Sequence, residues 1–201
     1  MKIFKSIQLV MVVVLMVGTA ACGKTPAARF YTLSPMATSD AASQNSTTDR
    51  HILSIGPVKV AAYLDRSEIV TRSHPTHVEL AAFDRWAEPF EEIVTSTLAE
   101  NIATLLPSVY AISDVWPEAK IEYQLLMKIK AFESDKSGNV SLDVSWGIVQ
   151  HSDRKMKAIY ESKIVLPGSS GDYEEITKNM SLALAELSKE VVAELKKLGI
   201  K

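Results

Sequence analysis

Two stretches of alternating apolar and polar residues determine the fold: Ile121-Glu122-Tyr123-Gln124-Leu125-Leu126-Met127-Lys128-Ile129 and Val140-Ser141-Leu142-Asp143-Val144-Ser145-Trp146-Gly147-Ile148. An apolar residue at every second position is typical of a strand with one face on a core and the other in water. Residues 134–139 are rich in turn-forming types, and a third strand is predicted over 155–166. We therefore expect a three-stranded antiparallel meander.

Shorter β-prone segments precede this meander and extend the predicted sheet. One of them contains Gly56-Pro57, which indicates a bulge or an edge irregularity, because proline cannot donate to a ladder. Two others flank a Ser-His-Pro-Thr turn, which is the pattern of a hairpin. These predicted strands cover 29–33, 52–60, 67–72, 77–83 and 109–115.

Two helices are predicted from apolar residues at helical spacing. The first begins at Pro89, which suits a first helical turn, and Pro107 ends it. The second begins at Asp172, which has the spacing of a capping box with Glu175, and Gly199 closes it. Helices of this kind cover one face of a sheet. The sequence thus predicts an α+β fold, a two-layer α/β sandwich with a mostly antiparallel sheet and two main helices on one face.

The first 21 residues have the order of an export signal. Two lysines give a basic start, an apolar run from Leu9 to Val17 follows, and small residues precede Cys22. The apolar run is shorter than the roughly 20 residues that span a bilayer. A cysteine after small residues resembles the lipobox of bacterial lipoproteins, in which the sulfur receives a diacylglycerol. We predict a lipoprotein signal peptide over 1–21 and lipidation at Cys22; the alternatives are a plain secretory signal or a signal anchor.

Residues 22–201 are long enough to form a single domain with its own core. A segment at about 36–50 is rich in Ser, Thr, Ala and Asn without apolar periodicity, which predicts a mobile loop. The net charge of −2 disfavours nucleic acid as a partner. Because the only cysteine is the predicted lipid acceptor, the domain is expected to fold without a disulfide.

The sequence contains no recognisable catalytic motif, so we expect no enzyme activity, no catalytic residues, no cofactor and no metal. His74 and His77 flank a proline turn, but no third metal ligand is evident. Paired carboxylates serve glycosidases, but acids at a helix start are explained by the helix dipole. The carboxylates in question are Asp65, Glu68, Asp84, Glu88 and Glu91.

Two segments, 57–72 and 85–89, have a composition that suits a contact surface. Tyr, Trp and Arg are the residues enriched in interface hot spots. The competing interpretation is that the aromatic residues lie in the core and that Asp65 pairs with Arg66 or Arg72 on the surface, where such pairs contribute about 0–1 kcal/mol. The candidate partner-binding residues are Tyr63, Leu64, Asp65, Arg66, Arg72, Trp86 and Glu88.

The same two segments resemble the signature segments of the ABC-type transport auxiliary lipoprotein family. The family pattern is a P-V…Y-L-D-R…I-V-x-R strand pair followed by W-A-E-P at a helix start. The matching residues are Pro57, Val58, Tyr63, Leu64, Asp65, Arg66, Ile69, Val70 and Arg72, then Trp86, Ala87, Glu88 and Pro89. The segment 30–33 is similar to the one that opens the mature domain, whereas Ser67-Glu68 departs from the Pro-Gln often found there.

The resemblance implies a non-enzymatic subunit of a phospholipid transport system of the mammalian cell entry (MCE) type. In such a system the auxiliary lipoprotein sits in the inner leaflet of the outer membrane and docks an MCE-domain protein. Gly23 follows the predicted lipidated cysteine. An aspartate at this position would indicate retention at the inner membrane, so a glycine agrees with the outer membrane. A ring-shaped partner favours a homo-oligomer of this subunit. The alternative is a stand-alone envelope-assembly or peptidoglycan-associated lipoprotein, and a periplasmic hydrolase is a third class.

Overall fold

The computed structural model describes residues 26–37, 50–113 and 119–200. The predicted signal peptide, Cys22 and most of the predicted loop at 36–50 lie outside the described residues. Within the described ranges the elements, in chain order, are β1 (Arg29–Tyr31), β2 (His51–Val60), β3 (Glu68–His74), β4 (His77–Trp86), α2 (Phe90–Leu105), β5 (Val109–Ile112), β6 (Tyr123–Asp135), β7 (Val140–Gln150), β8 (Lys155–Leu166) and α3 (Tyr173–Lys197).

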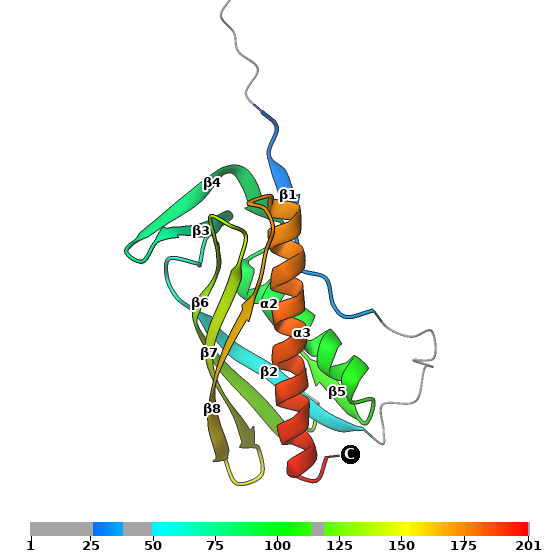
Figure 1. Cartoon of the computed structure of the whole chain (residues 1–201). Coiled ribbons are helices and arrows are strands. Elements are labelled where there is room, and N and C mark those ends of the chain that lie inside the picture. The colour runs from blue at the N-terminus through cyan, green and yellow to red at the C-terminus, as the bar shows by residue number, and fades with distance from the viewer. Residues whose placement is uncertain (1–25, 38–49, 114–118, 201) are drawn as a thin grey trace, which may run out of the picture.

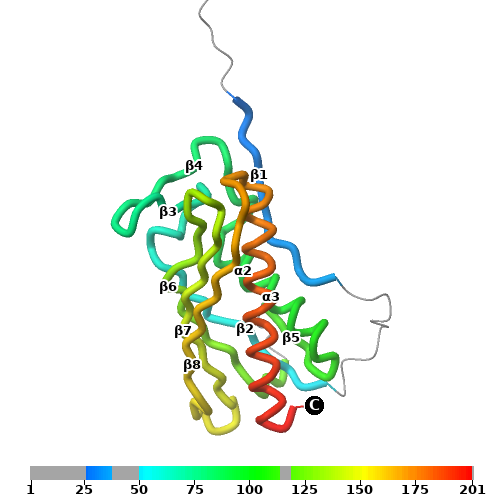
Figure 2. The backbone as a smooth tube through the Cα atoms, in the orientation of Figure 1, coloured from blue at the N-terminus to red at the C-terminus, as the bar shows by residue number. Residues whose placement is uncertain are grey.

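Strand β6 organises an eight-stranded mixed sheet (Figures 1 and 2). On one edge β7 runs antiparallel to β6, and β8 runs antiparallel to β7, which confirms the predicted meander. On its other edge β6 pairs in parallel with β2 and, near its end, with β3. The β3–β4 hairpin is also confirmed, while β1 and β5 add parallel edges to β4 and β2. The longest ladders are antiparallel. The parallel ladders join segments far apart in sequence, and the periodicity within one segment does not indicate which other segment it pairs with.

Both helices cover the same face of this sheet, which confirms the two-layer α+β architecture (Figure 1). Helix α2 lies over β2 and β5, α3 lies over β6 to β8, and the two helices pack against each other. Their apolar stripes meet in the core, where Leu98, Ile102, Leu184 and Leu187 are fully buried. Neither of the helices that the structure describes is both long and apolar enough to cross a bilayer.

Strand β1 attaches the start of the described chain to the end of β4. The buried carboxylate of Asp84 receives the Nε–H of Arg29 at 2.6 Å and the hydroxyl of Tyr31 at 3.0 Å. A buried carboxylate without such donors would be costly, so these bonds hold the short strand in register. Because Arg29 is only seven residues from Cys22, the predicted lipid anchor is within about 25 Å of this end of the sheet.

After β1 the chain crosses both helices before it leaves the described residues. The backbone N–H of Ser34 donates to the hydroxyl of Ser181 on α3 at 3.0 Å. The N–H of Met36 then donates to the side-chain oxygen of Asn101, a fully buried residue of α2, at 2.7 Å. The segment after β1 is thereby fastened to both helices.

The start of α3 is capped differently from the predicted capping box. Asp172 occupies the N-cap position without a side-chain cap hydrogen bond, so that part of the prediction was wrong. Glu175 does reach back, but its carboxylate accepts from the hydroxyl of Ser170 at 2.5 Å and from the N–H and hydroxyl of Ser169 at 2.8 Å. These bonds, that of Ser170 foremost, lower the pKa of Glu175.

Candidate partner-binding surface

Three side chains from distant segments meet on the face of the sheet that the helices leave open. Glu133, on β6, has only 4 % of its surface exposed. Its carboxylate accepts a hydrogen bond from the hydroxyl of Tyr63 at 2.5 Å and another from the Nε–H of Arg72. The Arg72 guanidinium also lies 5.6 Å from the centre of the Tyr63 ring, and its Nη1–H donates to the carbonyl of Pro75 at 3.1 Å. Tyr63 and Arg72 therefore cover Glu133 and hold β3 against β6.

Glu133 is the member of this cluster that sequence reasoning missed. The pairing of β6 with β7 shifts register between Ile129 and Ala131, so the alternation of the strand changes there. After the shift Phe132 points into the core and Glu133 points to the open face, where the segment after β2 covers it. The sequence shows a glutamate within a mainly apolar strand, but this pattern does not indicate which side chains would bind it. The structure also pairs Arg72 with Glu133, not with Asp65.

The cluster raises the pKa values of Tyr63 and Arg72. Burial, followed by the hydrogen bond to Glu133, raises the pKa of Tyr63 from 10.0 to about 12. The hydrogen bond to Glu133 raises the pKa of Arg72. Tyr63 is thus a neutral donor and Arg72 a cation throughout the physiological range.

The raised pKa of Tyr63 predicts a loss of stability in alkaline solution. The protonated phenol stabilises the fold fully below pH 10, and this contribution is lost as the pH rises towards 12. A Tyr63→Phe variant keeps the ring and removes the titration. We expect the free energy of unfolding, measured by urea denaturation, to fall more steeply for the wild type than for Tyr63→Phe across this range. Parallel curves for the two proteins would contradict the assigned role of the hydroxyl.

Two of the candidate partner-binding residues lie in the core and not on the surface. Leu64 is 2 % exposed and Trp86 is 5 % exposed. The Trp86 ring stacks on Phe90 with ring centres 4.8 Å apart, and Phe90 in turn contacts Phe132 at 5.7 Å. Of the two interpretations that the sequence left open, burial favours the core interpretation for these two side chains.

The other candidates lie on two segments that a backbone hydrogen bond joins at the end of the sheet next to β1. Asp65 and Glu88 are exposed, and Arg66 is half-buried. The backbone N–H of Trp86 donates to the carbonyl of Ser67 at 2.7 Å, which brings the turn after β2 beside the start of α2. We call Asp65, Arg66 and Glu88 the motif surface.

Two guanidinium groups at this end are incompletely satisfied. The Nε atoms of Arg66 and Arg85 are buried, and neither has a hydrogen-bond acceptor within the part of the chain that the structure describes. Arg85 does lie 4.0 Å from Glu68, a long and partly exposed ion pair. Buried donors without acceptors are uncommon in folded proteins.

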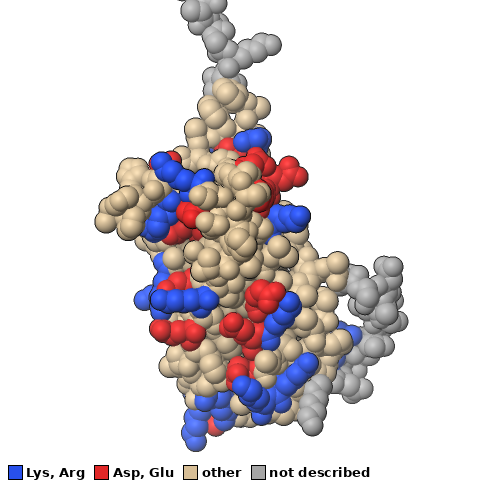
Figure 3. All heavy atoms as spheres, viewed as in Figure 1, with Lys and Arg blue, Asp and Glu red and all other residues tan. Residues whose placement is uncertain are grey.

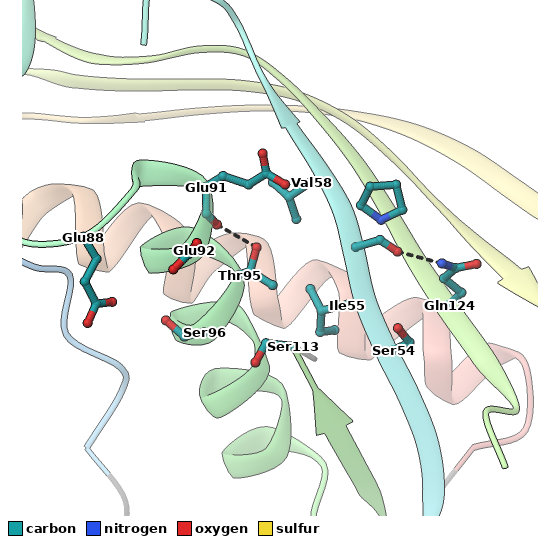
Figure 4. A pocket seen from close by; sticks show the side chains of 12 residues that line it. Ser54, Ile55, Val58, Glu88, Glu91, Glu92, Thr95, Ser96, Ser113 and Gln124 are labelled. Atoms are coloured by element: carbon teal, nitrogen blue, oxygen red, sulfur yellow. Dashed lines mark hydrogen bonds between the residues drawn. The ribbon is translucent and has the colours of Figure 1, made fainter. Parts of the chain in front are cut away.

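A shallow acidic pocket of about 520 Å³ adjoins the motif surface (Figure 4). Glu88, Glu91 and Glu92 at the start of α2 line it together with Gly56 and Pro57, at the irregularity of β2, and the Glu91 side chain extends toward Val58. The amide of Gln124 donates to the carbonyl of Gly56 at 2.8 Å and so braces this irregularity. The three carboxylates lie at the positive end of the helix dipole, which stabilises them there.

The histidines and acidic residues that the sequence offered as metal-binding or catalytic candidates lie within the described ranges. His74 and His77 lie exposed at the β3–β4 turn, and no cluster of metal-ligating side chains occurs among the described residues. Of the carboxylates noted in the sequence, Asp84 binds Arg29 and Glu68 faces Arg85, whereas Glu88 and Glu91 line the acidic pocket together. On the face shown in Figure 3, acidic and basic side chains are interspersed, and basic ones gather at the end far from β1.

Comparison with known proteins places the chain in a sequence family. The profile of a family described as ABC-type transport auxiliary lipoprotein component matches residues 31–192. This span contains both signature segments and nearly the whole described domain. No curated protein sequence matches the chain significantly.

Solved structures share the fold. An uncharacterized protein is 19 % identical, with a TM-score of 0.71 over 85 % of this chain and 99 % of its own. A protein of the DUF330 family from Xanthomonas campestris is 18 % identical, with a TM-score of 0.66 over 82 % and 93 % of the two chains. A dodecameric PelC from Paraburkholderia phytofirmans is 11 % identical over 72 % and 87 %, and its TM-score of 0.40 is too low to bear on assembly. At identities below 20 %, the likeness to the first two structures establishes the fold alone.

Proposed function

This chain belongs to the ABC-type transport auxiliary lipoprotein family, and we propose that it is the outer-membrane subunit of an MCE-type phospholipid transport system. In this role it is not an enzyme. Cys22 carries the lipid that holds it in the inner leaflet of the outer membrane, and the domain docks the MCE-domain protein. The observation that carries the proposal is the family match across residues 31–192, because an auxiliary component of a transporter requires a partner to assist.

The geometry supports a docking role for the motif surface. Asp65, Arg66 and Glu88 lie beside β1, the element nearest the predicted anchor, so a partner bound there would be held close to the lipid surface. The half-buried Arg66 adds a cation to this surface, next to the exposed carboxylates of Asp65 and Glu88. Tyr63 and Arg72 position the turn that carries this surface, whereas Leu64 and Trp86 support it from the core.

A mild-detergent pull-down of the full-length lipoprotein from its own membranes tests the proposal. We expect mass spectrometry to recover an MCE-domain protein with the wild type, and recovery to fall several-fold with an Asp65→Lys/Glu88→Lys variant. Both positions are exposed, so the substitutions should leave the far-UV circular dichroism unchanged. Glu100→Lys, a charge reversal at an exposed position of α2 outside the motif surface, is the matched control.

Two results would overturn parts of the proposal. Recovery of only peptidoglycan or barrel-assembly components would replace it with the envelope-assembly alternative. The wild type, the double variant and the control could instead recover equal amounts of an MCE-domain protein. That result would support the transport role but would show that the motif surface is not the docking site. A homo-oligomer of this subunit is part of the same proposal, and light scattering of the purified lipoprotein in detergent tests it.

A further inference from the structure

The face of the sheet that the helices leave open carries a groove of about 320 Å³. We call it the outer groove. Its walls come from four neighbouring strands, β2, β6, β7 and β8. Its apolar lining includes Ile159, which is 71 % exposed, and Met156, which is 43 % exposed. The volume falls within the range of small-molecule sites, roughly 300–1,000 Å³. The groove is lined by Pro57, Leu126, Lys128, Gly147, Met156 and Ile159, with Lys59 at its side.

Two local features of the sheet create this groove. Gly147 has no side chain, and a Cβ built on it would lie 2.8 Å from both the sulfur of Met156 and the carbonyl oxygen of Ala158. The pairing of β7 with β8 shifts register between Ile148 and Val149, where Met156 pairs with Val149 and Lys157 is the extra residue. A bulge re-aims the side chains beyond it, and here it directs Met156 over Gly147 on the open face.

A pair of lysines borders the apolar part of the groove. Lys59 and Lys128 occupy paired positions on β2 and β6, and both are exposed. Among the residues described, neither ammonium group has a carboxylate within 4.0 Å, because the acids of this face, Asp143 and Glu161, bind Lys130 at 3.5 and 2.8 Å. Like charges directly opposite one another on neighbouring strands are unfavourable. A bound anion would remove that repulsion.

We propose that the outer groove binds one anionic phospholipid, with its phosphate between Lys59 and Lys128 and an acyl chain along Leu126, Met156 and Ile159. The two lysines match the negative charge of the phosphate, and the apolar lining of the outer groove matches the polarity of the acyl chain. The choice of this occupant over an acidic peptide rests on the proposed transport function. The site deepens that function by making this subunit a carrier of the cargo and not only a docking platform.

Photocrosslinking in intact cells tests this proposal on the full-length lipoprotein. Ile159 is replaced by the photoreactive residue p-benzoylphenylalanine, the phospholipids are labelled with 32P, and the irradiated lipoprotein is purified. The diacylglycerol on Cys22 carries no phosphorus, so radiolabel reports crosslinked phospholipid alone. Val165, 66 % exposed on the same strand but outside the groove, and Leu182, 48 % exposed on α3, are the matched control positions.

We expect label with the probe at Ile159 and little with the probe at either control position. Adding Lys59→Glu and Lys128→Glu should reduce the label at Ile159 about fivefold, since two charge contacts to phosphate are reversed. Adding Lys178→Glu, an exposed lysine of α3, should not. Four results would each overturn the groove assignment. The label could be equal at all three positions, absent at Ile159, or unchanged by the two lysine substitutions. The probe at Ile159 could also crosslink a protein in place of lipid. Recovery of the MCE-domain protein from the same cells in any of these cases would leave the proposed function standing.

Discussion

Replacing Arg72 with alanine is expected to lower the free energy of unfolding by about 3 kcal/mol or more, because it leaves the carboxylate of Glu133 buried without its cation. The Glu133 side chain is 4 % exposed, and within the described ranges the one other side chain that binds it is the neutral phenol of Tyr63. A single hydrogen bond from a neutral donor compensates a buried negative charge only in part. Urea denaturation monitored by circular dichroism measures the loss.

Two further variants separate this mechanism from a general loss of surface charge. Arg85→Ala removes an arginine of the neighbouring strand whose ion pair is 4.0 Å long and partly exposed, so it should cost about 1 kcal/mol or less. Adding Glu133→Gln to Arg72→Ala removes the uncompensated charge and should recover part of the stability. If Arg72→Ala costs no more than Arg85→Ala, the buried pair does not stabilise the fold.

Replacing Trp86 with alanine is expected to cost about 3–5 kcal/mol, the range for removing a large aromatic side chain from a core. Trp86 is 5 % exposed and stacks on Phe90, which reaches Phe132 in the centre of the sheet. The cavity would open where the end of β4 meets the first turn of α2, so we expect local loosening there before global unfolding. Thermal and urea denaturation give the stability change, and hydrogen exchange locates it.

The control for Trp86 is an aromatic residue that is mostly exposed. Phe30, on β1, is 66 % exposed, and Phe30→Ala should change stability by no more than about 0.5 kcal/mol. This comparison also decides how a partner-binding defect of Trp86→Ala is interpreted. A variant that keeps full stability and yet loses the MCE-domain partner would move Trp86 from the core to the interface.

Local patterns predicted most of the secondary structure because they depend on neighbours within a few residues. Alternation in the meander, the proline at the start of α2 and the Gly-containing turns all act over such distances, and the structure confirms each element that they predicted. The parallel pairing of β2 with β6 lay outside their reach. It joins two segments with a helix and three strands between them, and the choice of partner depends on which edges remain free after the local elements form.

The amino-acid sequence by itself determined the α+β class, the order of elements, the signature segments of the family and the prediction of lipidation at Cys22. Only the tertiary structure decided that Arg72 binds Glu133 across 61 residues, that Trp86 lies in the core, and that Lys59 and Lys128 stand side by side above an apolar groove. The physical reason is register. A bulge or a shift of one residue reverses the face to which each later side chain of a strand points, and that outcome depends on the pairing of whole strands.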